Sequence, residues 1–218
     1  YTAGWRGGLA LATSQDLVHW KRPSLGLAGG NLILPRGALF AGGDNAVWLD
    51  LNTKDSMARY KFMAERNYNG SWASLYAEEK NIPSHTLQVS PDGRIWSAAV
   101  GVEGKASDYC SFFYNPFRNV WVYRIKENGP RGRCRYYLES PAFLQGNDWR
   151  KAVYWVNADS LDTPDPAIGD ETQLYSLNAV AYESIMLGEF YIYEGPANKV
   201  AAQRKTPKIT EIKLGFSR

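Results

Sequence analysis

The chain has 218 residues, 44% of them hydrophobic, which is enough for one domain with a buried core. Its 25 Lys and Arg residues and 22 Asp and Glu residues give a net charge of +3 and are spread along the chain, so the composition predicts no nucleic-acid partner. No apolar run approaches the length of a membrane span and no signal peptide opens the sequence, so we expect no membrane span in this chain.

Short β-strands are the elements that the sequence predicts. Aromatic residues are frequent, Gly and Pro interrupt the chain often, and long helical periodicity is absent, which together indicate an all-β protein. Asn69 and Gly70 are a strong hairpin signal between two of the strands. In chain order, the expected strands cover residues 8–12, 32–34, 46–50, 59–65, 71–76, 108–115, 120–125, 133–138, 174–182, 189–193 and 209–216.

A turn motif recurs along the chain. Residues 14–20 and 90–96 each contain a Ser-x-Asp turn followed by a Trp, and looser copies begin at Ser140 and Ser217. In such turns the Ser and Asp side chains cap backbone N–H groups, and we expect the Trp to pack between neighbouring sheets. We therefore interpret the motif as scaffold and not as chemistry.

The spacing of these turns indicates the architecture. A unit of strand, hairpin, strand and turn at roughly 40 to 50 residues, with insertions, is typical of a β-propeller blade, a small antiparallel sheet that must stack on its neighbours. About three such units are visible, fewer than the roughly four to eight that close a propeller. We therefore predict one β-propeller domain over residues 1–218 that is an incomplete fragment, with the rest of the propeller supplied by sequence outside this chain.

The two cysteines, Cys110 and Cys134, are expected to be free thiols. They fall on the first and third strands of a predicted meander, so the middle strand separates them by about 10 Å at roughly 4.8 Å per strand. This distance is too long for a disulfide. The two cysteines therefore do not indicate whether the protein resides in an oxidising or a reducing compartment.

Several segments resemble a known family. Residues 14–26 are similar to the S-x-D-x-x-x-W-x-x-P-x-L-G signature of five-bladed propeller glycoside hydrolases of the family 43 and family 32 type. Residues 108–116 resemble their D-x-x-x-x-F-x-D-P strand, with Asn115 where Asp is common, and residues 170–175 resemble the entry to a later blade. The resemblance implies five blades in the full protein, a bacterial source, and a periplasmic or secreted location.

The resemblance also implies a catalytic site of acidic side chains in a central funnel. Glycosidic cleavage needs a carboxylic acid to protonate the leaving oxygen and a carboxylate that activates water or attacks the anomeric carbon. The candidates are Asp44 as base or nucleophile, Asp108 as the residue that orients the sugar and tunes the acid, and Glu183 as general acid. Each could instead be a solvated or turn-capping carboxylate, and Glu171 or Glu189 could serve in place of Glu183.

Sugar contacts are expected from flat apolar faces and charged donors, which suit a polyhydroxylated ring. For the aromatic side chains, packing between blades is the alternative. The predicted substrate-binding residues are Trp5, Arg6, Asn45, Trp48 and Arg124, with Trp72 and Tyr114 as further candidates.

We expect no cofactor. Asp162, Asp165 and Asp170 could gather a structural calcium ion, although their spacing fits no EF-hand and a solvated loop is the alternative. His19 and His85 have no Cys or His neighbour at metal-ligand spacing, so we interpret both as structural.

Three functional hypotheses follow. The first is a hydrolase that cleaves glycosidic bonds of a plant or microbial polysaccharide or oligosaccharide. The second is a non-catalytic glycan-binding propeller, and the third is a scaffold propeller in which the acids only cap turns. The enzyme hypothesis predicts convergent carboxylates at the site. The glycan-binding hypothesis predicts aromatic side chains and amides there instead. Fold alone does not decide among them.

Overall fold

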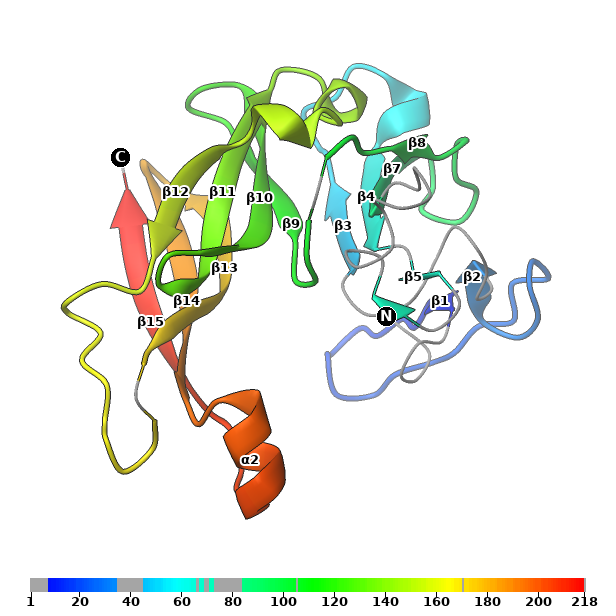
Figure 1. Cartoon of the computed structure of the whole chain (residues 1–218). Coiled ribbons are helices and arrows are strands. Elements are labelled where there is room, and N and C mark those ends of the chain that lie inside the picture. The colour runs from blue at the N-terminus through cyan, green and yellow to red at the C-terminus, as the bar shows by residue number, and fades with distance from the viewer. Residues whose placement is uncertain are drawn as a thin grey trace. The chain divides into compact units, whose positions relative to one another are not determined.

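The structure is a computed structural model that describes residues 8–34, 45–65, 67–68, 71–72, 84–104, 106–169 and 171–217. The chain divides into two compact units. Over their described residues, unit 1 comprises residues up to 110 together with 143–150, and unit 2 comprises residues 111–142 and 151–217. Both units are built from small antiparallel sheets (Figure 1).

Unit 1 contains one four-stranded sheet and two short strand pairs. The four-stranded sheet has the order β3-β4-β7-β8, and its neighbouring strands are antiparallel. The pairs are β1 with β2 and β5 with β6. The strands are β1 (Leu9–Ala10), β2 (Leu32–Leu34), β3 (Asn45–Leu49), β4 (Tyr60–Glu65), β5 (Asn67–Tyr68), β6 (Ser71–Trp72), β7 (His85–Ser90) and β8 (Val100–Gly101), with short 3-10 helices η1 (Ser56–Ala58), η2 (Phe143–Gln145) and η3 (Trp149–Lys151).

The core of unit 1 forms around β4, a central strand that is buried from Lys61 to Glu65. Phe62 and Ala64 point to the same side of the sheet because side chains alternate along a strand. They form an apolar cluster with Leu9 and Ile33, which joins the β1–β2 pair to the larger sheet. Removal of these apolar side chains from water is the main force that stabilises the contact.

The Ser-x-Asp turns cap the backbone as predicted. Asp92 Oδ1 accepts hydrogen bonds from the N–H groups two and three residues later, at 2.8 and 3.0 Å, and Asp16 Oδ1 does the same at 2.9 and 2.8 Å. Trp96 packs onto the core of unit 1, as expected. Trp20 is 55% exposed and its indole N–H donates to the carbonyl of Leu17, so the predicted packing of this Trp is wrong.

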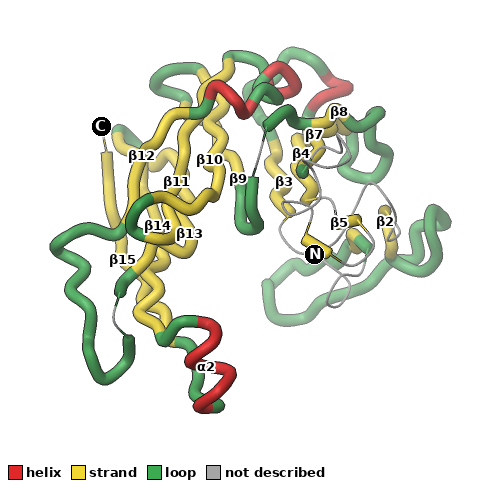
Figure 2. The backbone as a smooth tube through the Cα atoms, viewed as in Figure 1, coloured by secondary structure: helices red, strands yellow, loops and turns green. Residues whose placement is uncertain are grey.

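Unit 2 contains two antiparallel meanders, in which strands consecutive in sequence are neighbours in the sheet. One has the order β12-β11-β10-β9 and the other the order β13-β14-β15 (Figure 2). The strands are β9 (Ser111–Asn115), β10 (Val120–Gly129), β11 (Gly132–Ser140), β12 (Val153–Asn157), β13 (Gln173–Tyr182), β14 (Ile185–Gly195) and β15 (Ile209–Ser217). The short helix α2 (Asn198–Arg204) connects β14 to β15.

The two sheets of unit 2 pack against each other, with β13 lying against β9 and β11. Leu174, Leu177 and Ile192 form a buried apolar cluster from the second sheet, and Val156 of β12 and Phe190 of β14 pack onto it. This cluster occupies one end of the contact between the sheets.

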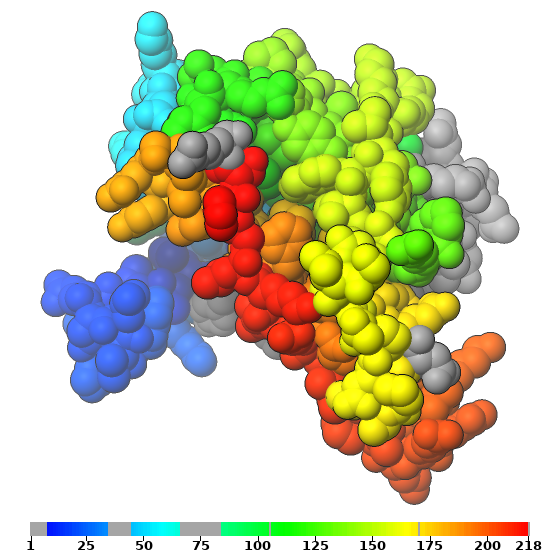
Figure 3. Space-filling view, turned by 90° about the vertical axis from the view of Figure 1, so that its left-hand side faces the viewer, coloured from blue at the N-terminus to red at the C-terminus, as the bar shows by residue number. Residues whose placement is uncertain are grey.

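The loop between β12 and β13 lies beside β15, as the yellow and red segments of Figure 3 show. Lys213 Nζ on β15 is 2.7 Å from Asp162 Oδ1 on this loop. A partly exposed ion pair of this kind contributes little free energy, so it fixes the position of the loop more than it stabilises the unit.

The prediction of an all-β chain is confirmed in its coarse form: the described residues form mostly antiparallel sheets and one short helix. The predicted meander of 108–115, 120–125 and 133–138 corresponds to β9, β10 and β11. Cys110 and Cys134 are free and buried, as expected. No helix in the described part of the chain combines the length and apolar character needed to cross a membrane. No propeller is identified, so the propeller and the single-domain assignment stay predictions.

His85, the first residue of β7, is fully buried in unit 1. Its Nδ1 lies 3.2 Å from Ser84 Oγ, and its ring lies 5.0 Å from that of Trp149. Within the described residues, Nε2 is buried and has no hydrogen-bond partner. Burial lowers the pKa of His85 to about 3, an effect that the negative charge of Asp108 opposes.

This burial predicts that unit 1 loses stability in weak acid. The unfolded chain binds a proton at His85 near pH 6.5, whereas the folded chain does so only near pH 3, so the free energy of unfolding falls as the pH drops between these values. From pH 7 to pH 5 the loss is about 2 kcal/mol. The measurement is urea unfolding at both pH values, followed by pulsed hydrogen exchange on peptides from β4 and β7.

The same experiment on His85→Gln should give a smaller loss between pH 7 and pH 5, because this side chain does not titrate. His19→Gln is the matched control, since the His19 side chain is 87% exposed. An equal pH dependence in the wild type and His85→Gln would show the prediction to be wrong.

Candidate functional site

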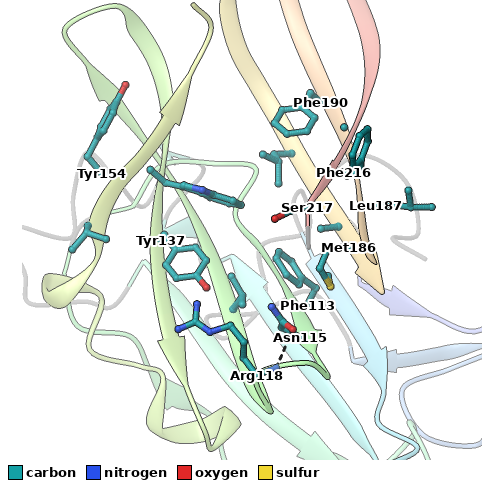
Figure 4. Close-up of a pocket in the computed structure, with 17 residues that line it drawn as sticks. Phe113, Asn115, Arg118, Tyr137, Tyr154, Met186, Leu187, Phe190, Phe216 and Ser217 are labelled. Carbon is teal, nitrogen blue, oxygen red and sulfur yellow. Dashed lines mark hydrogen bonds between the residues drawn. The ribbon is translucent and has the colours of Figure 1, made fainter. Parts of the chain in front are cut away.

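A cleft of about 380 Å³ opens between the two sheets of unit 2. Figure 4 shows residues of β9, β11 and β12 on one wall and residues of β14 and β15 on the other. Its volume lies in the range of small-ligand sites. The lining consists of Phe113, Asn115, Arg118, Val122, Tyr137, Val153, Tyr154, Trp155, Leu177, Ala179, Met186, Leu187, Gly188, Phe190, Gly215, Phe216 and Ser217.

One wall of the cleft carries an exposed aromatic side chain, Trp155, on the edge strand β12. Trp155 is 38% exposed and Val153 is 60% exposed. The Tyr154 ring lies 5.7 Å from that of Tyr136 and points away from the opposite wall (Figure 4). The Trp155 ring lies 5.1 Å from that of Tyr137 on β11, at an interplanar angle of 65°. The edge-on contact with Tyr137 holds the Trp155 ring in place and leaves a flat apolar surface for a ligand.

The opposite wall is shaped by a pair of glycines. Gly188 of β14 and Gly215 of β15 are directly paired, and the Phe190 ring lies beside both. A Cβ atom would come within 2.6 Å of that ring at Gly215 and within 3.1 Å at Gly188. The absence of side chains at these two positions therefore makes room for the aromatic ring that lines this wall.

A polar group stands at the edge of the aromatic wall. Arg118 Nη1 lies 2.6 Å from Glu139 Oε1, and the Tyr137 hydroxyl donates a short hydrogen bond to the same oxygen. The hydroxyl of Tyr137 lies on the side of its ring that faces Arg118 (Figure 4). Burial raises the pKa of Tyr137, and the hydrogen bond to Glu139 and the charge of Glu139 raise it further, so the phenol stays a protonated donor at neutral pH.

The turn between β9 and β10 positions Arg118. The side chain of Asn115 ends β9 by accepting hydrogen bonds from the N–H groups of Phe117, at 3.0 Å, and Arg118, at 3.3 Å. Asn119 then adopts a positive φ of 52°, which Asn tolerates better than most residues, and the chain enters β10. This local capping fixes the backbone from which Arg118 reaches Glu139.

The predicted catalytic residues are not brought into this cleft. Asp44 lies outside the described residues. Asp108 belongs to unit 1, and its Oδ1 accepts a hydrogen bond of 3.1 Å from Ser107. Glu183 is exposed on the two-residue turn between β13 and β14, with a φ of 50°. The roles assigned to these three residues stay predictions.

Of the predicted substrate contacts, none that the structure describes lines the cleft. Trp5 and Arg6 are outside the described residues. Asn45 and Trp48 are on β3 in unit 1, and both polar atoms of the Asn45 side chain are buried without a hydrogen-bond partner among the described residues. Trp72 ends β6, and its side chain lies outside the described part of the structure.

Arg124 links the two sheets of unit 2. It lies on β10 and is 3% exposed. Its guanidinium group donates to Ser111 Oγ on β9 at 2.6 Å, and to Ser176 Oγ and Asn178 Oδ1 on β13 at 3.2 and 3.0 Å. The predicted contact with a substrate stays a prediction, and the observed geometry gives this side chain a structural role.

The described residues offer one carboxylate at the cleft, Glu139, which stands behind Arg118 and Tyr137. Among the described residues that line the cavity there is no Asp or Glu. In the same part of the chain, no group of three or more His, Cys, Asp or Glu side chains is placed to hold a metal ion. The cleft therefore combines aromatic surfaces with hydrogen-bonding groups and has no pair of facing carboxylates.

Sequence reasoning missed the residues that define this cleft. Trp155 and Tyr154 stand in an apolar run. Tyr137 falls in the predicted strand 133–138, and Glu139 comes directly after its end. The available signal was their period-two alternation, which places Tyr137 and Glu139 on one side of the sheet. Nothing in the local pattern indicates that Trp155 comes to lie against Tyr137, because this depends on the pairing of β12 with β11.

Comparison with known proteins gives no family assignment. A scan against models of protein families finds no match to this chain, and a search of curated proteins finds none either. The similarity of residues 14–26 and 108–116 to glycoside hydrolases therefore rests on short motifs. Function has to be argued from the site.

Because Arg124 forms several buried hydrogen bonds, we predict that replacing it strongly lowers the stability of unit 2. Arg124→Met removes the donor to three oxygens between the sheets, so we expect the free energy of unfolding of unit 2 to fall by about 2–4 kcal/mol. The measurement is urea unfolding followed by pulsed hydrogen exchange on peptides from β10 and β13. Arg118→Met is the matched control; because its side chain is 61% exposed, the change should be below about 1 kcal/mol. Equal effects of the two substitutions would contradict the structural role of Arg124.

Proposed function

We propose that this chain binds a carbohydrate in the cleft of unit 2. The observation that carries the proposal is the aromatic wall of Trp155 and Tyr137, which stands next to the polar group of Arg118, Glu139 and the Tyr137 hydroxyl. A sugar ring has one apolar face and a rim of hydroxyl groups. It can therefore cover an aromatic ring and still form hydrogen bonds at its edge. The sequence resemblance to glycoside hydrolases supports the same class of ligand.

The construction of the cleft supports binding of a small ring or chain segment. Ligand sites are mostly apolar, with a few placed polar groups that fix orientation. Large rigid aromatic side chains contribute contact area at a low cost in conformational entropy. The walls of the cleft combine apolar and aromatic side chains with a few polar groups in the same way.

The small number of carboxylates at the cleft favours a binding function over hydrolysis. Cleavage of a glycosidic bond needs two carboxyl groups on either side of it, about 5 Å apart in retaining enzymes and roughly 6.5 to 9.5 Å apart in inverting ones. None of the lining residues that the structure describes is acidic, and Glu139 stands beside them. The hydrolase hypothesis with Asp44, Asp108 and Glu183 would need a different site.

We also propose that the meanders are blades of a β-propeller. The support is their topology: the four-stranded sheets β3-β4-β7-β8 and β12-β11-β10-β9 and the three-stranded sheet β13-β14-β15 each run up and down in chain order. Blades of this kind are short antiparallel sheets that bury their faces against one another. The packing of β13 against β9 and β11 in unit 2 is of this type.

The proposed function predicts that Trp155 is required for carbohydrate binding. Trp155→Ala should weaken binding at least tenfold, because truncation of a central aromatic anchor commonly costs 2 kcal/mol or more. The measurement is affinity electrophoresis in gels that contain a neutral glucan, galactan, mannan or xylan. Trp20→Ala is the matched control, since Trp20 is an exposed Trp in unit 1, and it should leave the migration unchanged.

Retardation that is equal in the wild type and Trp155→Ala, or no retardation by any polymer, would contradict the proposal. The release of reducing ends is measured on the same polymers. If the wild type releases reducing ends and Asp108→Asn does not, the hydrolase hypothesis is favoured instead.

A further inference from the structure

We propose that the cleft selects uncharged sugar units and disfavours sugars that carry a carboxylate. This inference rests on the proposed function and names the class of ligand within it. The geometry that points to it is the ion pair of Arg118 and Glu139, with Tyr137 bonded to the same carboxylate oxygen.

The one charged side chain among the described residues that line the cleft is already paired. It belongs to Arg118, whose guanidinium nitrogen lies 2.6 Å from Glu139 Oε1. A ligand carboxylate could bind Arg118 only by displacing Glu139 or by approaching it, and like charges at such distances repel each other. A carboxylate on the apolar walls would lose its hydration without compensation.

The polar group of Arg118, Glu139 and Tyr137 can form hydrogen bonds with sugar hydroxyl groups. Guanidinium is a donor with several N–H groups, of which the Glu139 pair uses one nitrogen. The Tyr137 hydroxyl donates its proton to Glu139, so its oxygen is left as an acceptor toward the cleft. A sugar hydroxyl can accept from the first and donate to the second, because it is both acceptor and donor.

The polar group and the apolar surface are separated by a single side chain. Tyr137 contacts Trp155 through its ring at 5.1 Å and Glu139 through its hydroxyl. A ring that covers Trp155 therefore has its edge near Arg118. This arrangement matches a neutral pyranose or furanose unit, in which the apolar face and the hydroxyl rim are adjacent.

The test uses pairs of probes that differ only in charge. Glucan, galactan and mannan oligosaccharides are compared with the same oligosaccharides after oxidation of the C6 hydroxymethyl to a carboxylate. Binding to the full chain is measured by isothermal titration calorimetry at pH 7 and low salt. We expect the neutral member of at least one pair to bind ten or more times as tightly as its oxidised form.

Two variants locate the origin of this preference. Glu139→Gln leaves the charge of Arg118 unbalanced, so the ratio of neutral to oxidised affinity should fall at least fivefold. Tyr137→Phe removes the hydroxyl but keeps both charges, so this ratio should change less than twofold. Circular dichroism and thermal unfolding establish that each variant is folded before its binding is compared.

The outcomes separate the two proposals. If neither member of any pair binds, or if Trp155→Ala does not weaken binding, the proposed function fails and the inference fails with it. If oxidised probes bind as tightly as neutral ones and Trp155 is still required, the function stands and the inference is overturned. An unchanged ratio in Glu139→Gln would also overturn it, because the selectivity would then not come from the ion pair.

Discussion

Buried arginine side chains, Arg124 and Arg135, form hydrogen bonds between the two sheets of unit 2, and those of Arg124 reach the most strands. A guanidinium group that is 3% exposed must be hydrogen-bonded, because an unsatisfied charge in the interior is far more costly than a satisfied one. The bonds of Arg124 to Ser111, Ser176 and Asn178 join β9, β10 and β13. Because these bonds are directional, they restrict how one sheet can slide on the other more than apolar contacts alone would. The position of the two walls of the cleft follows from this restriction.

The cleft opens beside the apolar cluster, since Leu177 of the cluster and Phe190, which packs onto it, also line the cleft. Leu174, Leu177 and Ile192 fill one part of the contact, while the glycine pair and Phe190 shape the wall of the open part. The polar group at the edge is assembled from a turn and a strand: Asn115 caps the turn that carries Arg118, and β11 carries Tyr137 and Glu139. Local backbone chemistry and long-range packing are therefore both needed to form the site.

Local patterns predicted the strands well and the site poorly. The meander of β9, β10 and β11 could be predicted because its strands are rich in aromatic and β-branched residues and lie between clear turn signals. The Ser-x-Asp turns were predicted because their hydrogen bonds are local, but the burial of Trp20 was not, since it depends on whether another element covers the turn. Glu183 was assigned to a site because it follows a strand, whereas the chain uses it for a two-residue hairpin turn at positive φ without the usual Gly or Asn. The cleft is a product of tertiary packing between β12, β11 and the second sheet, which no local pattern contains.

The paired glycines under Phe190 have a consequence for protein engineering. Because a side chain at Gly215 would collide with a ring that is packed into the core of unit 2, mutagenesis libraries aimed at new ligands have little freedom on that wall. The edge strand β12 is different, since Val153 lines the cleft and is 60% exposed. The molecule thus divides its cleft into a fixed half and an adjustable half, and diversity introduced at β12 would alter what is bound while preserving the fold that holds it.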